Sequence, residues 1–147
     1  MSARVDIQTN SSGVEAWISE EPQRQQEATQ LFQEEGSFLV MEEMRNQVPI
    51  KTGFLRESIT RTFTPDGFLV YPTAPYAPFV DKGTAPHMIF PTSGKVLSWT
   101  NPSGAQIFAR YVRHPGSRGR FFIANTFFAV KDRLFELMRN ILGRVYQ

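Results

Sequence analysis

Apolar side chains recur at helical spacing in two long segments, one in each half of the chain. The first segment predicts a helix over residues 20–48, whose apolar positions face away from a run of glutamates. Ser19 is a favourable N-cap, and Glu20, Glu21 and Pro22 follow it in the first turn, where carboxylates and proline are favoured. Pro49 ends the helix because the residue before a proline disfavours helical geometry. The second segment predicts a helix over residues 121–146, whose broad apolar stripe is interrupted by Lys131.

Short strands are predicted where apolar and polar residues alternate between turn residues. Residues 4–8 alternate in this way and are followed by a turn at residues 10–13. A β-hairpin is predicted where residues 60–64 and 68–71 flank the turn sequence Pro-Asp-Gly at residues 65–67.

Two short elements are expected on either side of this hairpin. Thr52 is placed to cap a helical turn that carries Phe54 and Leu55. Residues 77–81 suggest a strand or a short turn, which residues 82–84 end.

Residues 85–119 are rich in proline, glycine and serine, with apolar patches between them. Residues 88–90, 96–99 and 107–112 are candidate strands between turns at 91–94 and 101–104. Long irregular segments in compact domains are usually functional or ordered by a partner. The segment is therefore expected to be an extended loop or a β-hairpin insertion.

These elements predict a single α+β domain, in which the N-terminal and C-terminal helices pack on a small antiparallel sheet. Its expected parts are an N-terminal arm at 1–18, the helix at 20–48, the small sheet at 50–84, the extended loop at 85–119 and the helix at 121–146.

Composition narrows the class of protein. Hydrophobic residues make up 41% of the chain and charged residues 20%, which is ordinary for a globular domain. No stretch approaches the roughly 18 apolar residues of a membrane span, and no secretory signal is recognised at the N-terminus. The absence of cysteine excludes disulfides and thiol chemistry and fits assembly in a reducing cytoplasm.

Charge is distributed unevenly along the chain. Residues 1–50 contain three arginines and nine carboxylates, a net charge of −6, whereas residues 100–147 contain eight basic and two acidic residues, a net charge of +6. Such opposed ends either guide one copy onto the next or form two independently solvated faces, and charge alone does not decide between them.

The sequence offers little for catalysis. His87 and His114 each lie beside a proline in a loop, without further ligands at helical spacing. The segment Ser-Gly-Lys-Val at residues 93–96 lacks the first glycine and the final Ser or Thr of a phosphate-binding loop. Asp81 is the only acid in an aromatic setting, and a salt bridge or loop hydrogen bond is the favoured role for it. The residues therefore give little support for an enzyme or a metal site.

A basic stretch precedes the last helix. Residues 110–120 contain four arginines, Arg110, Arg113, Arg118 and Arg120, and no acid. A loop of this kind contacts a nucleic-acid backbone, a DNA-filled channel or the acidic face of a neighbour, unless it is simply solvated. No recognition helix for sequence-specific DNA binding is found, so a neighbour or a channel is favoured.

Three sequence elements occur in the order found in one family. The segment at residues 48–59 resembles the "P-x-x-T-G-x-L-R-x-S-I" element of the lambdoid-type phage tail-component proteins. Residues 76–84 resemble that family's "Y-A-x-x-V-E-x-G-T" element, with Asp81 in place of Glu. Residues 114–124 resemble its "H-P-G … F-x-x-A" element. The matching residues are Pro49, Thr52, Gly53, Leu55, Arg56, Ser58, Tyr76, Asp81, Gly83, Thr84, His114, Pro115, Gly116 and Phe122.

The resemblance implies a structural virion protein that is not an enzyme and needs no cofactor. Members of this family are neck or tail-completion subunits that form a ring, expected to be hexameric, between the head connector and the tail. The implied partners are copies of the chain, the head connector or adaptor, the tail tube or tail terminator, and passing genomic DNA. No membrane partner is implied, and the implied location is the virion, assembled in the host cytoplasm.

Other functions remain open. A tail terminator, head-closure or minor tail protein fits the same residues. A DNA-binding protein that uses the basic loop is a more distant alternative, and a small hydrolase is disfavoured because no nucleophile, base or metal set is assembled.

Overall fold

The structure, a computed structural model, describes residues 11–147, with side chains from Glu21 onward. Its helices are α1 (Ser11–Gln47), α2 (Phe54–Glu57), α3 (Ala77–Lys82) and α4 (Phe122–Val145). Its strands are β1 (Ile59–Thr64), β2 (Gly67–Pro72), β3 (Gly83–Thr84), β4 (His87–Ile89), β5 (Leu97–Thr100), β6 (Gln106–Ala109), β7 (Val112–His114) and β8 (Ser117–Arg118). The α+β class predicted from the sequence is confirmed.

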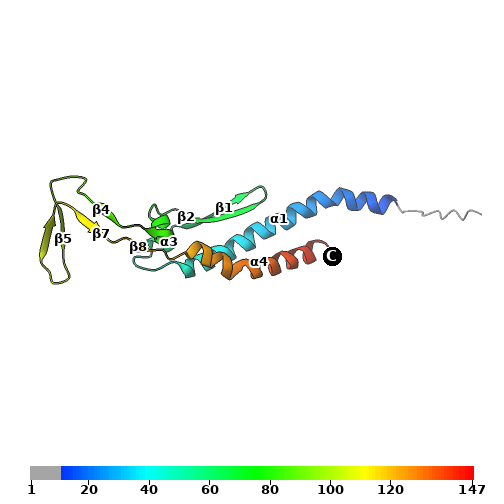
Figure 1. The fold of residues 1–147 in the computed structure, drawn as a ribbon. Coiled ribbons are helices and arrows are strands. Elements are labelled where there is room, and N and C mark those ends of the chain that lie inside the picture. The colour runs from blue at the N-terminus through cyan, green and yellow to red at the C-terminus, as the bar shows by residue number, and fades with distance from the viewer. Residues whose placement is uncertain (1–10) are drawn as a thin grey trace, which may run out of the picture.

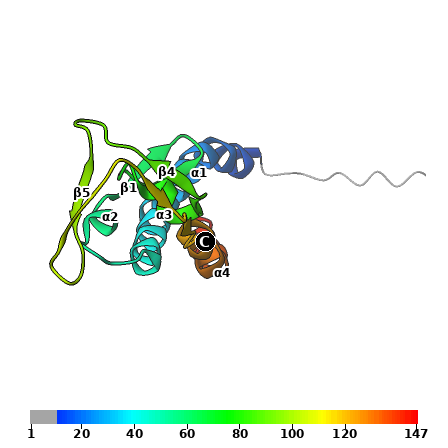
Figure 2. The same ribbon diagram turned by 60° about the vertical axis from the view of Figure 1, so that its left-hand side comes forward.

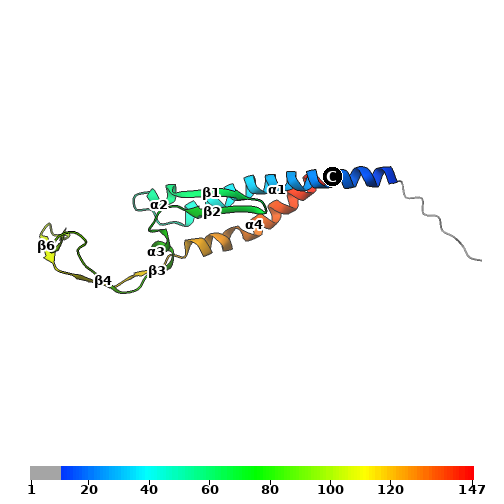
Figure 3. The same ribbon diagram turned by 90° about the horizontal axis from the view of Figure 1, so that it is seen from above.

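The two long helices lie side by side and run in opposite directions, with the β1–β2 hairpin along α1 (Figures 1 and 3). Gly36 allows this close packing, because a Cβ atom at this position would lie 2.9 Å from Phe68 of β2 and 3.5 Å from Leu134 of α4. The hairpin forms at the predicted Pro-Asp-Gly turn, in a register that runs from Ile59 opposite Pro72 to Thr64 opposite Gly67.

The hydrophobic core lies where the C-terminal end of α1 meets α2, α3 and the start of α4. Its buried residues are Met44, Val48, Leu55, Ile59, Ala74, Ala77 and Phe122. The core is small for a chain of this length, since large apolar side chains elsewhere are exposed.

The N-terminal prediction was partly wrong. Helix α1 begins at Ser11, so the predicted turn at residues 10–13 is helical from Ser11, and both Ser19 and Pro22 lie inside the helix. A proline with carboxylates beside it is typical of a first turn, yet a long helix tolerates one missing N–H when the turns on both sides continue. The predicted strand at residues 4–8 lies outside the described residues.

The segment at residues 77–81 is the short helix α3 and not a strand. Proline in its first turn presets helical geometry, and the helix ends at Gly83, whose φ is 79°. β3, which follows, pairs with β8, so the sheet predicted within residues 50–84 is only the two-stranded β1–β2 hairpin.

Residues 83–118 fold into one antiparallel ribbon that projects from the body, here called the arm (Figure 1). The pairs β3–β8 and β4–β7 share one register, from Gly83 opposite Arg118 to Ile89 opposite Val112. The segment expected to be an extended loop or β-hairpin insertion at 85–119 is therefore a hairpin.

The arm bends partway along its length. Residues 90–96 on one side face only residues 110–111 on the other, so β5–β6 pairs in a shifted register. The tip accordingly leaves the direction of the inner ribbon (Figure 2). The single strand predicted over residues 107–112 is interrupted at this bend, between β6 and β7.

Within residues 11–147, no helix has the combination of length and apolar character that crossing a bilayer requires.

Candidate interaction site at the root of the arm

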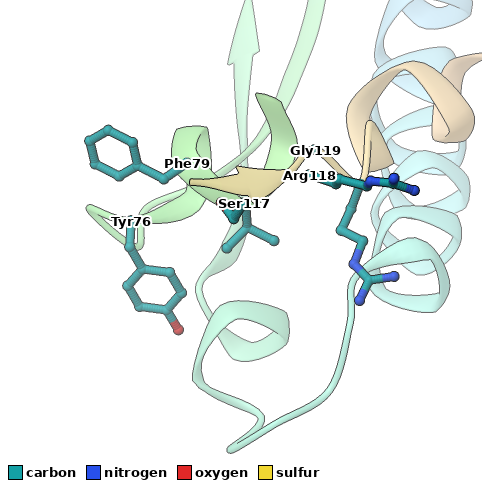
Figure 4. Close-up of a pocket in the computed structure, with 7 residues that line it drawn as sticks. Tyr76, Phe79, Ser117, Arg118 and Gly119 are labelled. Carbon is teal, nitrogen blue, oxygen red and sulfur yellow. The ribbon is translucent and has the colours of Figure 1, made fainter. Parts of the chain in front are cut away.

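The three family-like segments, far apart in the sequence, meet where the arm leaves the body. One hollow there is lined by residues 49–53 and Leu55, and an adjoining one by Phe79 and residues 117–119. Tyr76, Val80 and Arg120 line both. Figure 4 shows the rings of Tyr76 and Phe79 at the edge of the second hollow, beside the strand that carries Ser117.

Asp81 connects α3 to the start of α4. Its buried carboxylate accepts a hydrogen bond from the Ile123 N–H at 3.1 Å, and its backbone oxygen accepts one from the Phe121 N–H at 2.8 Å. Phe121 is the N-cap residue of α4 and makes no side-chain cap bond, so Asp81 supplies the cap from another element. Of the two roles favoured for Asp81, a salt bridge or a loop hydrogen bond, the structure shows a hydrogen bond, and its donor lies in the first turn of a helix.

Glycines allow the backbones at the root to approach closely. Gly83 and Gly116 have φ values of 79° and 86°, which disfavour any side chain. A Cβ atom on Gly83 would overlap the Ser117 carbonyl oxygen, and one on Gly116 would overlap the Thr84 carbonyl oxygen. The Gly-Thr segment at residues 83–84 and the His-Pro-Gly segment at residues 114–116 therefore lie on opposite sides of one close contact between two backbone segments.

The two histidines lie opposite each other on β4 and β7, with ring centroids 5.0 Å apart. His114 Nδ1 accepts a hydrogen bond from the Gly116 N–H at 3.0 Å, which fixes the turn that follows the strand. His87 Nδ1 lies 2.9 Å from the Ala85 carbonyl oxygen. Among the described residues, no group of three or more potential ligands gathers around a metal position.

The first family-like segment also has a structural role. Gly53 adopts a left-handed conformation before α2, and Thr52 Oγ1 lies 3.5 Å from the Phe54 nitrogen, a weak form of the predicted cap. Leu55 is buried in the core, and the Ser58 hydroxyl donates to the Leu55 carbonyl oxygen at 2.7 Å. Arg56 and Pro49 are exposed.

The structure does not bring the four arginines into one cluster. Arg118 and Arg120 line the hollow at the root, Arg113 lies on β7, and Arg110 is at the bend of the arm. Within the described part of the chain, none of the four forms an ion pair with a carboxylate. All four lie within residues 82–131, a segment that contains no aspartate or glutamate.

Part of the charge asymmetry is satisfied within one chain, an arrangement that the sequence did not indicate. The acidic α1 lies against the basic α4, where Arg144 pairs with Glu35 at 2.9 Å and Arg133 approaches Glu43 at 3.9 Å. These two pairs use charges that would otherwise be available to partners.

The sequence did not predict which large apolar side chains would be exposed. Large apolar side chains are exposed along the arm, at Met88, Phe90, Val96, Trp99, Phe108 and Tyr111. Others are exposed on α4, at Ile123, Phe127, Phe128, Phe135 and Leu142. The breadth of the apolar stripe on α4 could have indicated this exposure, because a helix that packs on one side only does not need so many apolar positions.

Comparisons with protein families, curated proteins and solved structures found no match to this chain.

Proposed function

We propose that this chain is a structural subunit of a phage neck, a tail-completion protein that forms a ring between the head connector and the tail. The observation that carries the proposal is that many large apolar side chains are exposed on the arm and on α4. Surfaces of this kind are sites of association. A ring subunit needs such surfaces on every copy, whereas an isolated monomer gains nothing from them.

The arm supports the same role. An isolated two-stranded ribbon is marginally stable in water, and most of this one projects beyond the body (Figure 3). Phe90 and Tyr111 pair across the bend with ring centroids 6.3 Å apart, yet both remain more than half exposed. The arm is thus suited to lie on a neighbouring copy, on the connector above or on the tail tube below.

The acid-free segment suits a position beside DNA. Arg110, Arg113, Arg118 and Arg120 are the candidate contacts with the passing genome, or with an acidic partner. Phosphate contacts of this type are salt-sensitive and independent of sequence, which would let DNA pass. The role needs neither catalysis nor a cofactor, and it places the chain in the virion after assembly in the host cytoplasm.

Two other functions compete with this proposal. A tail terminator, head-closure or minor tail subunit would use the same surfaces, and gene order distinguishes these positions. The absence of acid over residues 82–131 also favours a DNA-binding protein, which predicts tight duplex binding that weakens steeply with salt.

Disruption of the gene in the virus that carries it tests the proposal. We expect complete heads and tails to accumulate unjoined, and the wild-type chain supplied from a plasmid to restore joining. Normal particles after disruption would contradict the proposal.

A further inference from the structure

We propose that an exposed stripe on α4 packs against an exposed face of α1 in a second copy of this chain. The α4 stripe consists of Phe128, Lys131, Phe135 and Arg139. The α1 face consists of Glu27, Leu31, Glu34 and Phe38. The inference rests on the proposed ring, because it names the two surfaces through which copies would join.

The α4 stripe is left uncovered by its own chain. Successive members are three or four residues apart, so they lie on one side of the helix. Phe128 and Phe135 are 65% and 72% exposed, although the helix buries Val130 and Ile141 on its other side. Lys131 Nζ lies 5.9 Å from the centre of the Phe128 ring, which positions a cation beside an aromatic ring.

The α1 face is also largely exposed, with Leu31 half-buried, and it has the opposite charge. α1 contacts α4 through Glu35 and Glu43, and contacts the β1–β2 hairpin through Gln33 and Ser37. The α1 face lies away from α4 and is bordered by the hairpin residue Arg61, which donates to the Glu34 carbonyl oxygen at 3.3 Å. Its Phe38 is 55% exposed.

A hollow beside this face is lined by Glu34, Glu35, Phe38, Arg61 and Phe63. Across the described residues, the carboxylates of Glu27 and Glu34 make no ion pair. Both are therefore available to a cation from outside the chain.

The two surfaces match in only one direction. Each spans eleven residue steps, about 16 Å of helix. Antiparallel packing places Phe128 on Phe38, Lys131 on Glu34, Phe135 on Leu31 and Arg139 on Glu27. Parallel packing would place Phe128 on Glu27 and Phe135 on Glu34, which buries carboxylates against aromatic rings without a cation.

A second copy is the partner that fits. α1 and α4 of one chain already pack through other faces, so the match cannot form within a chain. Two α4 stripes packed on each other would bring the cations Lys131 and Arg139 of both copies together, which is unfavourable. Two different patches on every copy make a head-to-tail contact, the kind that closes into rings.

A pair of charge reversals tests the contact. Lys131→Glu places two carboxylates together, and Glu34→Lys places two cations together. We expect each variant alone to associate at least about tenfold more weakly than wild type. An equimolar mixture should recover assembly, because the carboxylate introduced at position 131 of one variant then meets the ammonium group introduced at position 34 of the other. Every remaining contact in the mixture is the native pair.

Native mass spectrometry with one variant labelled with ¹⁵N counts each variant in the assemblies. Recovery through this contact requires alternating copies, so mixed rings should hold equal numbers of each. Asn140→Glu and Gln26→Lys are the matched controls, since they change exposed residues on other faces of the same helices and should associate like wild type. Unchanged circular dichroism and melting temperature establish that all variants fold.

The outcomes separate this inference from the proposed function. If wild type assembles and both reversals assemble equally well, the two faces are wrong and the ring proposal stands. If the mixture fails to recover assembly, the residues do not face each other. A wild-type chain that stays monomeric at every concentration also overturns the inference, while gene disruption decides the neck role separately.

Discussion

The Asp81 carboxylate accepts a hydrogen bond from the Ile123 backbone N–H, with 3.1 Å between oxygen and nitrogen. The two residues are 42 positions apart, and the whole arm lies between them in the sequence. This bond ties α3 to the first turn of α4 beneath the arm. The position of the arm on the body therefore depends on a helix cap.

Asp81→Ala should lower the free energy of unfolding by about 1–2 kcal/mol, as the loss of a helix cap does. Asp81→Asn keeps an acceptor oxygen and should cost less. Chemical denaturation followed by circular dichroism measures both. Asp132→Ala, an exposed acid on α4, is the control. Equal stability of the Asp81 and Asp132 variants would show that the cap contributes little.

Gly116→Ala should destabilise the root of the arm by at least about 1–3 kcal/mol, because its φ is 86° and a Cβ atom would overlap the Thr84 backbone. Gly143→Ala is the matched control. That position is helical with open space around it, so the change should be neutral or stabilise by up to about 1 kcal/mol. Denaturation curves give the free energy of unfolding of each variant. A Gly116→Ala variant as stable as wild type would contradict the close backbone contact described at this position.

Local signals predicted several elements correctly. The Pro-Asp-Gly turn gave the β1–β2 hairpin, and the apolar periodicity of residues 121–146 gave α4 to within one residue at each end. The start of α1 was misplaced because Pro22 resembles a first-turn proline. The α3 helix was not identified because six residues carry too little periodicity to separate a helix from a strand.

The candidate site was predicted only in part. The family-like residues were identified, but their meeting at the root of the arm depends on pairing between strands that are distant in the sequence, such as β3 with β8. No local pattern encodes such pairing. The exposure of Phe128 and Phe135 was also hidden, since periodicity shows that a stripe is apolar but not which part of it the chain itself covers.

Trp99 should report contact at the tip of the arm. It lies on β5 and is 42% exposed, so its emission should shift to shorter wavelength when a partner covers the tip. A Trp17→Phe background leaves Trp99 as the only tryptophan. Fluorescence recorded across a concentration series checks this. Emission that stays constant while the mass of the assembly increases would mean that the tip does not contact neighbouring copies.

Replacing Arg110, Arg113, Arg118 and Arg120 together by serine should leave the fold intact, because none of them forms an ion pair within residues 21–147. We expect joining of heads to tails, or infectivity, to fall in complemented particles. Replacing the same four by lysine keeps the charge and should retain most of the function if phosphate attraction is what matters. Normal joining and normal infectivity of the serine variant would exclude the proposed contacts.

Imaging the neck of the virus particle by electron cryomicroscopy tests the central claim most directly. The proposed function predicts a closed ring of this chain between the head connector and the tail. The further inference adds that α4 of each copy is antiparallel to α1 of the next. A neck that contains no copy of the chain, together with a purified monomer that binds duplex DNA tightly, would contradict it.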